Sequence, residues 1–378
     1  MPQWVVVQYG FRVTLGQFQF MPMKVHNFSA GPGILPAEVL QQAAEAAINF
    51  KGMGLSLLEI SHRSKEYVAA IDEAMDVVRR LLHLSDDYAV VYLQGGASLQ
   101  FSMVPFNLLR PEGYAAYVNS GVWATKAIQE AEKLGKTKVI ASSKDANFSY
   151  VPKGYDIPSD ADYLHITSNN TIYGTQMKDF PQSPVPLVCD MSSDIFSRVF
   201  DPNQFGLIYA GAQKNMGPAG ATLAIIRKDL LGKSGRNMPT MLNYAPHIEN
   251  GSMYNTPSVF SVYVCMLTLQ WLERNGGVPA AETRNRAKAD LLYNEIDRNG
   301  LFKGTCATED RSDMNATFVL TDESHAADFE KMLKDANISG LKGHRSVGGY
   351  RASIYNAMPI ESVQVLVDVM KTFEKQRG

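Results

Sequence analysis

The chain has 378 residues, of which 45% are hydrophobic and 20% are charged, and its formal net charge at pH 7 is −2. This length and composition suit a globular protein with one large and one smaller domain. The near-neutral charge and the scattered Lys and Arg residues argue against a nucleic-acid track or an anionic-membrane surface. No apolar run reaches the roughly 20 residues of a membrane-spanning helix.

The cysteines and the N-terminus give two further expectations. Cys189, Cys265 and Cys306 have neither zinc-ligand nor disulfide spacing, so we expect no metal site and a reducing, cytoplasmic compartment. Residues 1–22 hold alternating apolar residues without a basic start or a cleavage site, which makes a poor signal peptide. We interpret them as an extension outside the fold, with an edge strand as the alternative.

Helical and strand patterns alternate through the first two thirds of the chain. Helices are predicted over residues 37–50 and 64–82, the second with Ser64 as its N-cap. A buried strand at 89–93 is followed by a Gly-Gly break and a helix from 98 to 109. Further strands are predicted at 115–118, 138–141, 163–167, 185–189, 207–210 and 221–226, and a helix at 123–134. This alternation predicts a mostly parallel α/β sheet covered on both faces.

The composition changes at residues 275–279, where Gly and Pro cluster. Beyond this point, helices are predicted at 280–299, 326–336 and 360–376, and strands at 316–320 and 351–355. These elements predict a compact α+β unit at the C-terminal end.

Three polar segments follow predicted strands, where α/β proteins bind their ligands. Gly95-Gly96-Ala97-Ser98 precedes a helix, whose free N–H groups favour a phosphate, although such a turn is more often only a turn. Asp190 follows the strand at 185–189 and is either a functional acid or a cap. Lys214 stands among small and apolar residues, where desolvation lowers the pKa of an ammonium and suits a Schiff-base lysine.

These signals together fit one cofactor. Pyridoxal 5′-phosphate needs a lysine for its aldehyde, a carboxylate at its ring nitrogen and a cup for its phosphate. Trp123 follows the turn at Gly121, where it either stacks on the cofactor ring or packs in the core. The sequence therefore predicts a pyridoxal-phosphate site built on Lys214 and Asp190.

Longer motifs carry a resemblance to a known family. They are NFSAGP (27–32), EISHRSK (59–65), SNNTIYG (168–174), YAGAQKN (209–215) and GHRSVGGYRASIYNA (343–357). From about Val25 to the C-terminus the chain resembles the phosphoserine aminotransferases, class-V enzymes of fold type I. The resemblance implies a large domain over 37–276 with a mostly parallel seven-stranded sheet. It also implies a small α+β domain formed by 23–36 and 277–378.

The resemblance also implies roles for individual residues. Lys214 matches the Schiff-base lysine, Asp190 the acid at the pyridine nitrogen and Trp123 the stacking ring. Further cofactor contacts match Ala97, Ser98, Thr171 and Gln213, with Asn255 and Thr256 from the neighbouring subunit of a homodimer that shares its active sites. The substrate-phosphate cluster matches His62, Arg63, His344 and Arg345, and Arg351 matches the residue that binds the α-carboxylate. Ser98 and Leu99 depart from the versions found in many members.

The implied reaction transfers an amino group between L-glutamate and 3-phosphohydroxypyruvate, giving O-phospho-L-serine and 2-oxoglutarate in serine biosynthesis. A further activity on 4-phosphohydroxy-L-threonine in vitamin B6 synthesis is also implied. The alternatives are an alanine–glyoxylate aminotransferase or a cysteine desulfurase, for which Cys306 is the loop candidate, although a buried strand-end thiol is favoured. A non-catalytic α/β protein that binds a small anion is the most distant alternative.

Overall fold

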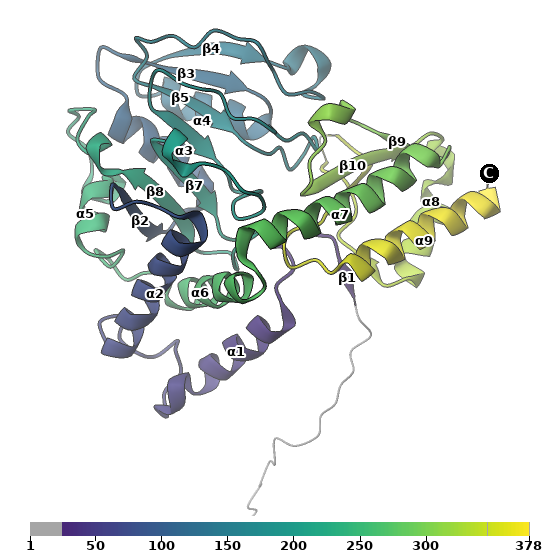
Figure 1. The fold of residues 1–378 in the computed structure, drawn as a ribbon, viewed down its shortest axis with the longest axis horizontal. Helices are drawn as coiled ribbons and strands as arrows, with labels where there is room; N and C mark the ends of the chain where they lie inside the picture. Colours follow the sequence, from purple (N-terminus) through teal and green to yellow (C-terminus); the bar gives the residue numbers. More distant parts are fainter. Residues whose placement is uncertain (1–24, 346, 378) are drawn as a thin grey trace, which may run out of the picture.

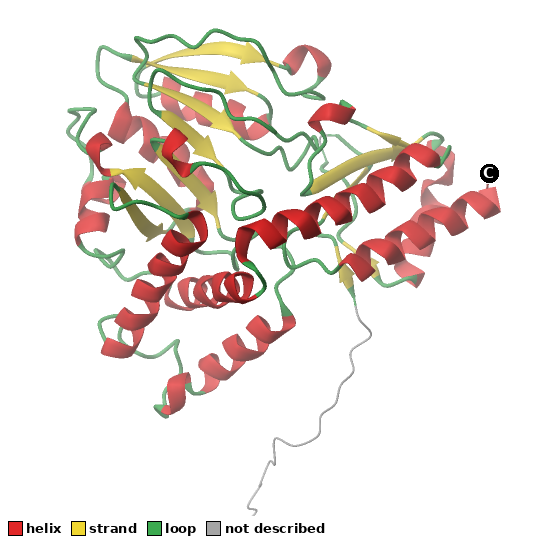
Figure 2. Ribbon diagram, viewed as in Figure 1, coloured by secondary structure: helices red, strands yellow, loops and turns green. Residues whose placement is uncertain are grey.

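The computed structural model of the chain describes residues 25–345 and 347–377. The extension interpreted at 1–22 lies outside the described residues. Within them, the strands form one seven-stranded, one three-stranded and one two-stranded sheet (Figures 1 and 2). The predicted combination of a large α/β sheet with a smaller α+β unit is confirmed.

The large sheet is mostly parallel. Its spatial order is β2 (Tyr88–Leu93), β8 (Thr222–Arg227), β7 (Leu207–Gly211), β6 (Leu187–Asp190), β5 (Tyr163–Thr167), β3 (Tyr114–Asn119) and β4 (Lys136–Ser142). The pairings from β7 through to β4 are parallel, whereas β8 is antiparallel to both β7 and β2. The carboxyl ends of β5, β6 and β7 therefore meet at one edge of the sheet.

Both faces of this sheet are covered, because successive side chains of a strand point to opposite sides. In β7, Leu207 and Tyr209 belong to the hydrophobic cluster that contains α3 (Gly96–Leu108) and α4 (Val122–Glu132). Ile208 and Ala210 belong to the opposite cluster. That cluster contains α1 (Ala37–Ile48), α2 (Lys65–Leu82) and α6 (Val259–Arg274).

The helices show where sequence patterns are informative. Ser64 caps α2 as predicted, since its Oγ accepts a hydrogen bond from the Tyr67 amide at 3.3 Å. Helix α6 was not predicted: it is apolar on most sides and buried, so it lacks the one-sided periodicity of a surface helix. The helix expected over 37–50 ends at Ile48 and is followed by a short 3₁₀ turn, Phe50–Gly52.

Two predicted helix starts were placed too late. Helix α3 begins at Gly96 rather than at 98, because Gly95 adopts a left-handed conformation (φ 86°) that turns the chain directly into the helix. Helix α7 (Gly277–Arg298) begins inside the Gly/Pro cluster rather than at 280. Pro279 is tolerated in its first turn, because the N–H that proline lacks has no partner there.

The smaller sheet is antiparallel and runs in the order β12 (Tyr350–Ser353), β10 (Asn315–Leu320) and β9 (Phe302–Gly304). Its core contains residues from α7, α8 (Ala326–Asp335) and α9 (Ile360–Arg377) (Figure 1). The two-stranded sheet pairs β1 (His26–Asn27) in parallel with β11 (Ile338–Ser339). The first described residues thus join the C-terminal part of the chain.

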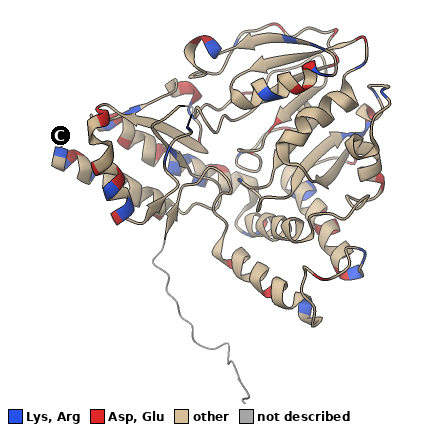
Figure 3. Ribbon diagram, turned by 180° about the vertical axis from the view of Figure 1, so that it is seen from behind, with Lys and Arg blue, Asp and Glu red and all other residues tan. Residues whose placement is uncertain are grey.

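Two properties of the described residues bear on function: the character of the helices and the distribution of charge. None of the helices in residues 25–345 and 347–377 has the length and apolar character needed to cross a membrane. Lys and Arg residues are interspersed with Asp and Glu residues along the ribbon rather than gathered in one track (Figure 3).

Candidate active site

A cavity of about 140 Å³ lies where β5, β6 and β7 end. It is lined by Gly96, Ala97, Ser98, Phe101, Trp123, Thr167, Asn169, Asp190, Ser192, Ser193, Gln213 and Lys214. The predicted phosphate turn, acid, lysine and aromatic ring thus surround one space, although they are far apart in the sequence.

Lys214 follows β7 and borders the cavity. Its Nζ donates a hydrogen bond to Thr171 Oγ1 at 2.9 Å. Burial is the main cause that lowers the pKa of Lys214 from 10.5 to about 8; the positive charge of Arg351 acts in the same direction, and Asp190 and Asp194 oppose it. Roughly a tenth of the amine is therefore uncharged at pH 7, far more than for an exposed lysine, and the uncharged form is what a nucleophile or base requires.

Asp190 is the last residue of β6 and is only 5% exposed. One carboxylate oxygen accepts a hydrogen bond from the Ser192 amide at 2.9 Å. Burial raises the pKa of Asp190, while the hydrogen bond from Ser192 and the charge of Lys214 oppose this change. The loop-capping and functional interpretations of Asp190 are therefore compatible, because the residue makes a local hydrogen bond and also lines the cavity.

Trp123 lies in the first turn of α4, and its ring centroid is 5.9 Å from Lys214 Nζ. The turn before it needs glycine, because a Cβ at Gly121 would lie 2.4 Å from Asn170 Oδ1. Within the described residues, the buried Trp123 Nε1 and Thr167 Oγ1 have no hydrogen-bond partner. Buried polar groups are normally paired, so these two atoms point to a polar ligand in the cavity.

The start of α3 supplies the anion-binding end of the cavity. Gly96, Ala97 and Ser98 form the first turn of the helix, whose amides have no partner inside the helix and whose dipole favours negative charge. A lysine, a buried acid, an aromatic ring and this turn fit pyridoxal 5′-phosphate. Lys214 would bind its aldehyde, Asp190 its ring nitrogen and the α3 turn its phosphate.

A cationic group adjoins the cavity on the side of the smaller sheet. Arg351, on β12, donates a hydrogen bond from Nη1 to the Thr171 carbonyl at 3.2 Å. Burial lowers the pKa of His344, and the positive charges of Arg351, Arg345 and Lys126 lower it further. Such a concentration of positive charge is a site for an anionic substrate.

Four predicted site residues lie elsewhere in the chain. Arg63 donates to His62 Nε2 at 3.4 Å just before α2, and Asn255 Nδ2 donates to Gln94 Oε1 at 3.2 Å. Gln94 Nε2 in turn donates to the Thr256 carbonyl at 2.7 Å. None of these four is among the residues that line the Lys214 cavity within the described chain.

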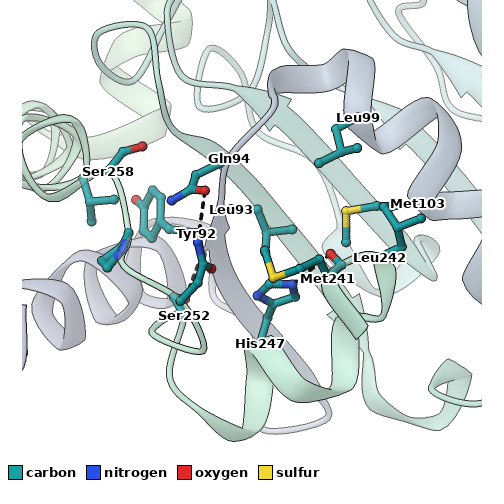
Figure 4. Close-up of a pocket in the computed structure, with 13 residues that line it drawn as sticks. Tyr92, Leu93, Gln94, Leu99, Met103, Met241, Leu242, His247, Ser252 and Ser258 are labelled. Carbon is teal, nitrogen blue, oxygen red and sulfur yellow. Dashed lines mark hydrogen bonds between the residues drawn. The ribbon is translucent and has the colours of Figure 1, made fainter. Parts of the chain in front are cut away.

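A second cavity, of about 250 Å³, is larger and mostly apolar (Figure 4). Leu99 and Met103 of α3 line it together with Met241, Leu242 and Asn255. It contains neither a lysine nor a carboxylate, so its size does not make it the reactive site. The chemistry belongs to the smaller cavity around Lys214.

Several lining residues were not singled out from the sequence, among them Phe101, Thr167, Asn169, Ser192 and Ser193. Thr167 ends β5, and Ser192 follows Asp190 closely, so their strand-end position was the signal that could have identified them. Asn169 carried the same signal, because it follows the end of β5 by two residues. Phe101 carried none, because only the packing of the chain brings it to the cavity.

The groups in this cavity together support the chemistry of an enzyme that binds pyridoxal 5′-phosphate and acts on an anionic amino acid. The model of the aminotransferase class-V family matches residues 25–366, and the chain belongs to this family.

Its similar relatives include phosphoserine aminotransferases. The chain is 61% identical over 355 residues to the phosphoserine aminotransferase of Flavobacterium johnsoniae, which covers 94% of this chain and 100% of that protein. The structure of the enzyme from Bacillus circulans subsp. alkalophilus has a TM-score of 0.92 at 46% identity, covering 94% and 100% of the two chains. The pyridoxal-phosphate-bound enzyme from Trichomonas vaginalis has a TM-score of 0.87 at 36% identity, covering 92% and 100%. The resemblance predicted from the motifs is confirmed.

Proposed function

We propose that the chain is a phosphoserine aminotransferase that transfers an amino group between L-glutamate and 3-phosphohydroxypyruvate. The products are O-phospho-L-serine and 2-oxoglutarate. The observation that carries this proposal is the cavity lined by Lys214 and Asp190, beside the cationic Arg351 and Arg345 and the neighbouring His344. The identity to relatives of that name supports the choice of substrates.

When bound, pyridoxal 5′-phosphate supplies an electron sink for the negative charge that develops at the amino-acid Cα. The Nζ atom of Lys214 takes the proton from this carbon and later returns one, which its pKa of about 8 suits. Thr171 Oγ1 accepts a hydrogen bond from Nζ and so orients the amine. Asp190, fixed by the Ser192 amide, holds a proton at the ring nitrogen.

The cationic residues select and orient the substrate. Arg351 binds the α-carboxylate through its planar guanidinium, because two parallel N–H groups match two carboxylate oxygens. His344 and Arg345 bind the distal group, which is a carboxylate in glutamate and a phosphate in the phosphorylated partner. The same residues accept both anions because a guanidinium pairs with carboxylate and phosphate alike, and a histidine ring can donate an N–H in either protonation state.

The remaining predicted residues support a homodimer with shared active sites. His62, Arg63, Asn255 and Thr256 line no part of the Lys214 cavity of their own chain among the described residues, so a second copy would supply them. Large apolar side chains are exposed in the segment from α1 to the loop before α2, including Ile48, which is 76% exposed, and Leu58, which is 66% exposed. An interface that buries these side chains would remove apolar surface from water.

Mixed dimers test this arrangement. Lys214→Ala and Arg63→Ala variants are each expected to be inactive, but subunit exchange between them restores one intact site per mixed dimer. Restored activity in the mixture supports shared sites. Activity that never exceeds the sum of the two separate variants would contradict them.

Three further expectations accompany the main proposal. We place the large domain at 37–276 and the small domain at 23–36 together with 277–378. We also propose a cytoplasmic location, and a second activity on 4-phosphohydroxy-L-threonine in vitamin B6 synthesis. Assaying the purified enzyme with that compound tests the second activity directly.

A visible spectrum of the purified protein tests the main proposal. The cofactor bound to Lys214 gives a visible band, which glutamate should remove and 3-phosphohydroxypyruvate should restore, whereas pyruvate should not. A protein that stays colourless with added pyridoxal phosphate would remove the cofactor assignment. A band that responds equally to pyruvate would keep the cofactor and remove the proposed substrate.

A further inference from the structure

Lys288 is a buried lysine in α7 that the proposed reaction does not use. It is only 1% exposed. Its Nζ donates hydrogen bonds to the backbone carbonyls of Ile354 at 2.8 Å and Tyr355 at 2.7 Å. Burying an amine is costly, so such a residue is expected to serve a specific purpose.

The surroundings suit Lys288 as a hydrogen-bond donor to the main chain. Burial, and then the positive charge of Arg284, lower the pKa of Lys288 from 10.5 to about 7. An uncharged amine has two N–H donors, which match the two carbonyls that it meets. Through these two hydrogen bonds, Nζ fixes one short segment of chain, residues 354–356.

This segment contacts the residue next to Lys214. The Asn356 amide donates to Asn215 Oδ1 at 3.0 Å. Asn356 is itself held from α7, because Asn285 Nδ2 donates to Asn356 Oδ1 at 2.8 Å. Helix α7 thus fixes the segment at two points, through Lys288 and through Asn285.

The same segment also packs close to the Lys214 backbone, with Gly33 between them. The Gly33 amide donates to the Gln213 carbonyl at 2.7 Å. A Cβ at Gly33 would lie 2.9 Å from the Tyr355 ring and 3.2 Å from the Lys214 carbonyl. Gly33 is therefore confined between Tyr355 and Lys214, and a shift of Tyr355 would be transmitted to the lysine.

We propose that Lys288 is a positioning residue for Lys214: it fixes residues 354–356, and the position of this segment sets where the reactive amine lies. Arg351 is held independently, because β12 pairs with β10 through the Thr317–Arg351 register. Loosening residues 354–356 should therefore reduce kcat more than it weakens substrate binding. This inference rests on the proposed function, since it concerns the lysine of that reaction.

The test compares Lys288→Met, which keeps an unbranched side chain one atom shorter than lysine and removes the N–H donors, with the wild-type holoenzyme. We expect kcat to fall by about 10- to 100-fold, because small misplacements of a catalytic group have effects of this size. The KM for glutamate should stay within about twofold. The pH at which the visible band of the Lys214-bound cofactor changes should also shift by at least about half a unit.

The matched control is Asn299→Ala at the end of the same helix. Asn299 is also 1% exposed, and its Nδ2 donates to the Met370 carbonyl at 3.1 Å, away from residues 354–356. This control should lower the melting temperature without moving kcat or the spectral transition. Equal losses of kcat in both variants, or wild-type kcat and transition pH in Lys288→Met, would overturn the proposal.

Lys288→Gln carries the test if Lys288→Met does not fold. Glutamine keeps two N–H donors, but its side chain is one bond shorter, so it reaches the carbonyls poorly. We expect a several-fold loss of kcat and a shift of the spectral transition in the same direction. Wild-type values of both would overturn the proposal. An inactive wild-type enzyme would instead count against the proposed function.

Discussion

The pKa of Lys214 in the cofactor-free chain is the most direct measure of the electrostatics of this cavity. It is lowered from 10.5 to about 8, mainly by burial, and this net change corresponds to about 3 kcal/mol between the charged and uncharged forms. Charged neighbours act in both directions, and Asp194 raises the pKa as Asp190 does. Asp190 raises the pKa of the amine because it stabilises the ammonium, and Arg351 lowers it because it repels the ammonium.

Two substitutions separate these effects. Asp190→Asn removes the negative charge, so the pKa of Lys214 should fall below about 8. Arg351→Gln removes the positive charge, so the pKa should rise. With an effective dielectric constant of about 20, unit charges several ångströms apart interact by roughly 1 to 3 kcal/mol, so each shift should be about one pKa unit or more.

The rate of reductive methylation of Lys214, followed by peptide mass spectrometry across pH after cofactor removal, measures this pKa. The wild-type midpoint should lie near 8, with the two variants on opposite sides of it. The exposed Lys133 in the same samples serves as the internal control. A wild-type midpoint near 10.5, or shifts of the same sign in both variants, would refute the electrostatic reasoning.

Three further predictions concern local packing and reactivity. Ser64→Ala removes the N-cap of α2 and should lower the free energy of unfolding by about 1 kcal/mol in chemical denaturation, whereas no change would mean that the cap contributes nothing. Gly33→Ala places a Cβ 2.9 Å from the Tyr355 ring, so it should lower the free energy of unfolding by about 1 to 3 kcal/mol and should also reduce activity. Gly300→Ala is its control, because nothing lies within 4 Å of the added Cβ; equal effects at both glycines would contradict the packing argument. Burial raises the pKa of Cys306 to about 11, so mild alkylation should leave the amino-transfer activity intact, and loss of activity on selective labelling would revive the desulfurase alternative.

The sequence alone predicted those features that depend on residues close together in the chain. The strands at Tyr163–Thr167 and Leu207–Gly211, the cap at Ser64 and the glycine turn before α3 follow from short-range periodicity and backbone preferences. The motifs identified the family, and the family model and the relatives confirm it. The roles assigned to individual site residues stay predictions, including those of Lys214 and Asp190.

Only the tertiary structure decided which of these residues share a cavity. Asp190 and Lys214 meet because neighbouring parallel strands end at the same edge of the sheet, which no local pattern specifies. The separation of His62 and Arg63 from that cavity, and the burial of Lys288 against Ile354, likewise depend on packing between distant segments. Local patterns determine where helices and strands form, but long-range packing determines which side chains come into contact.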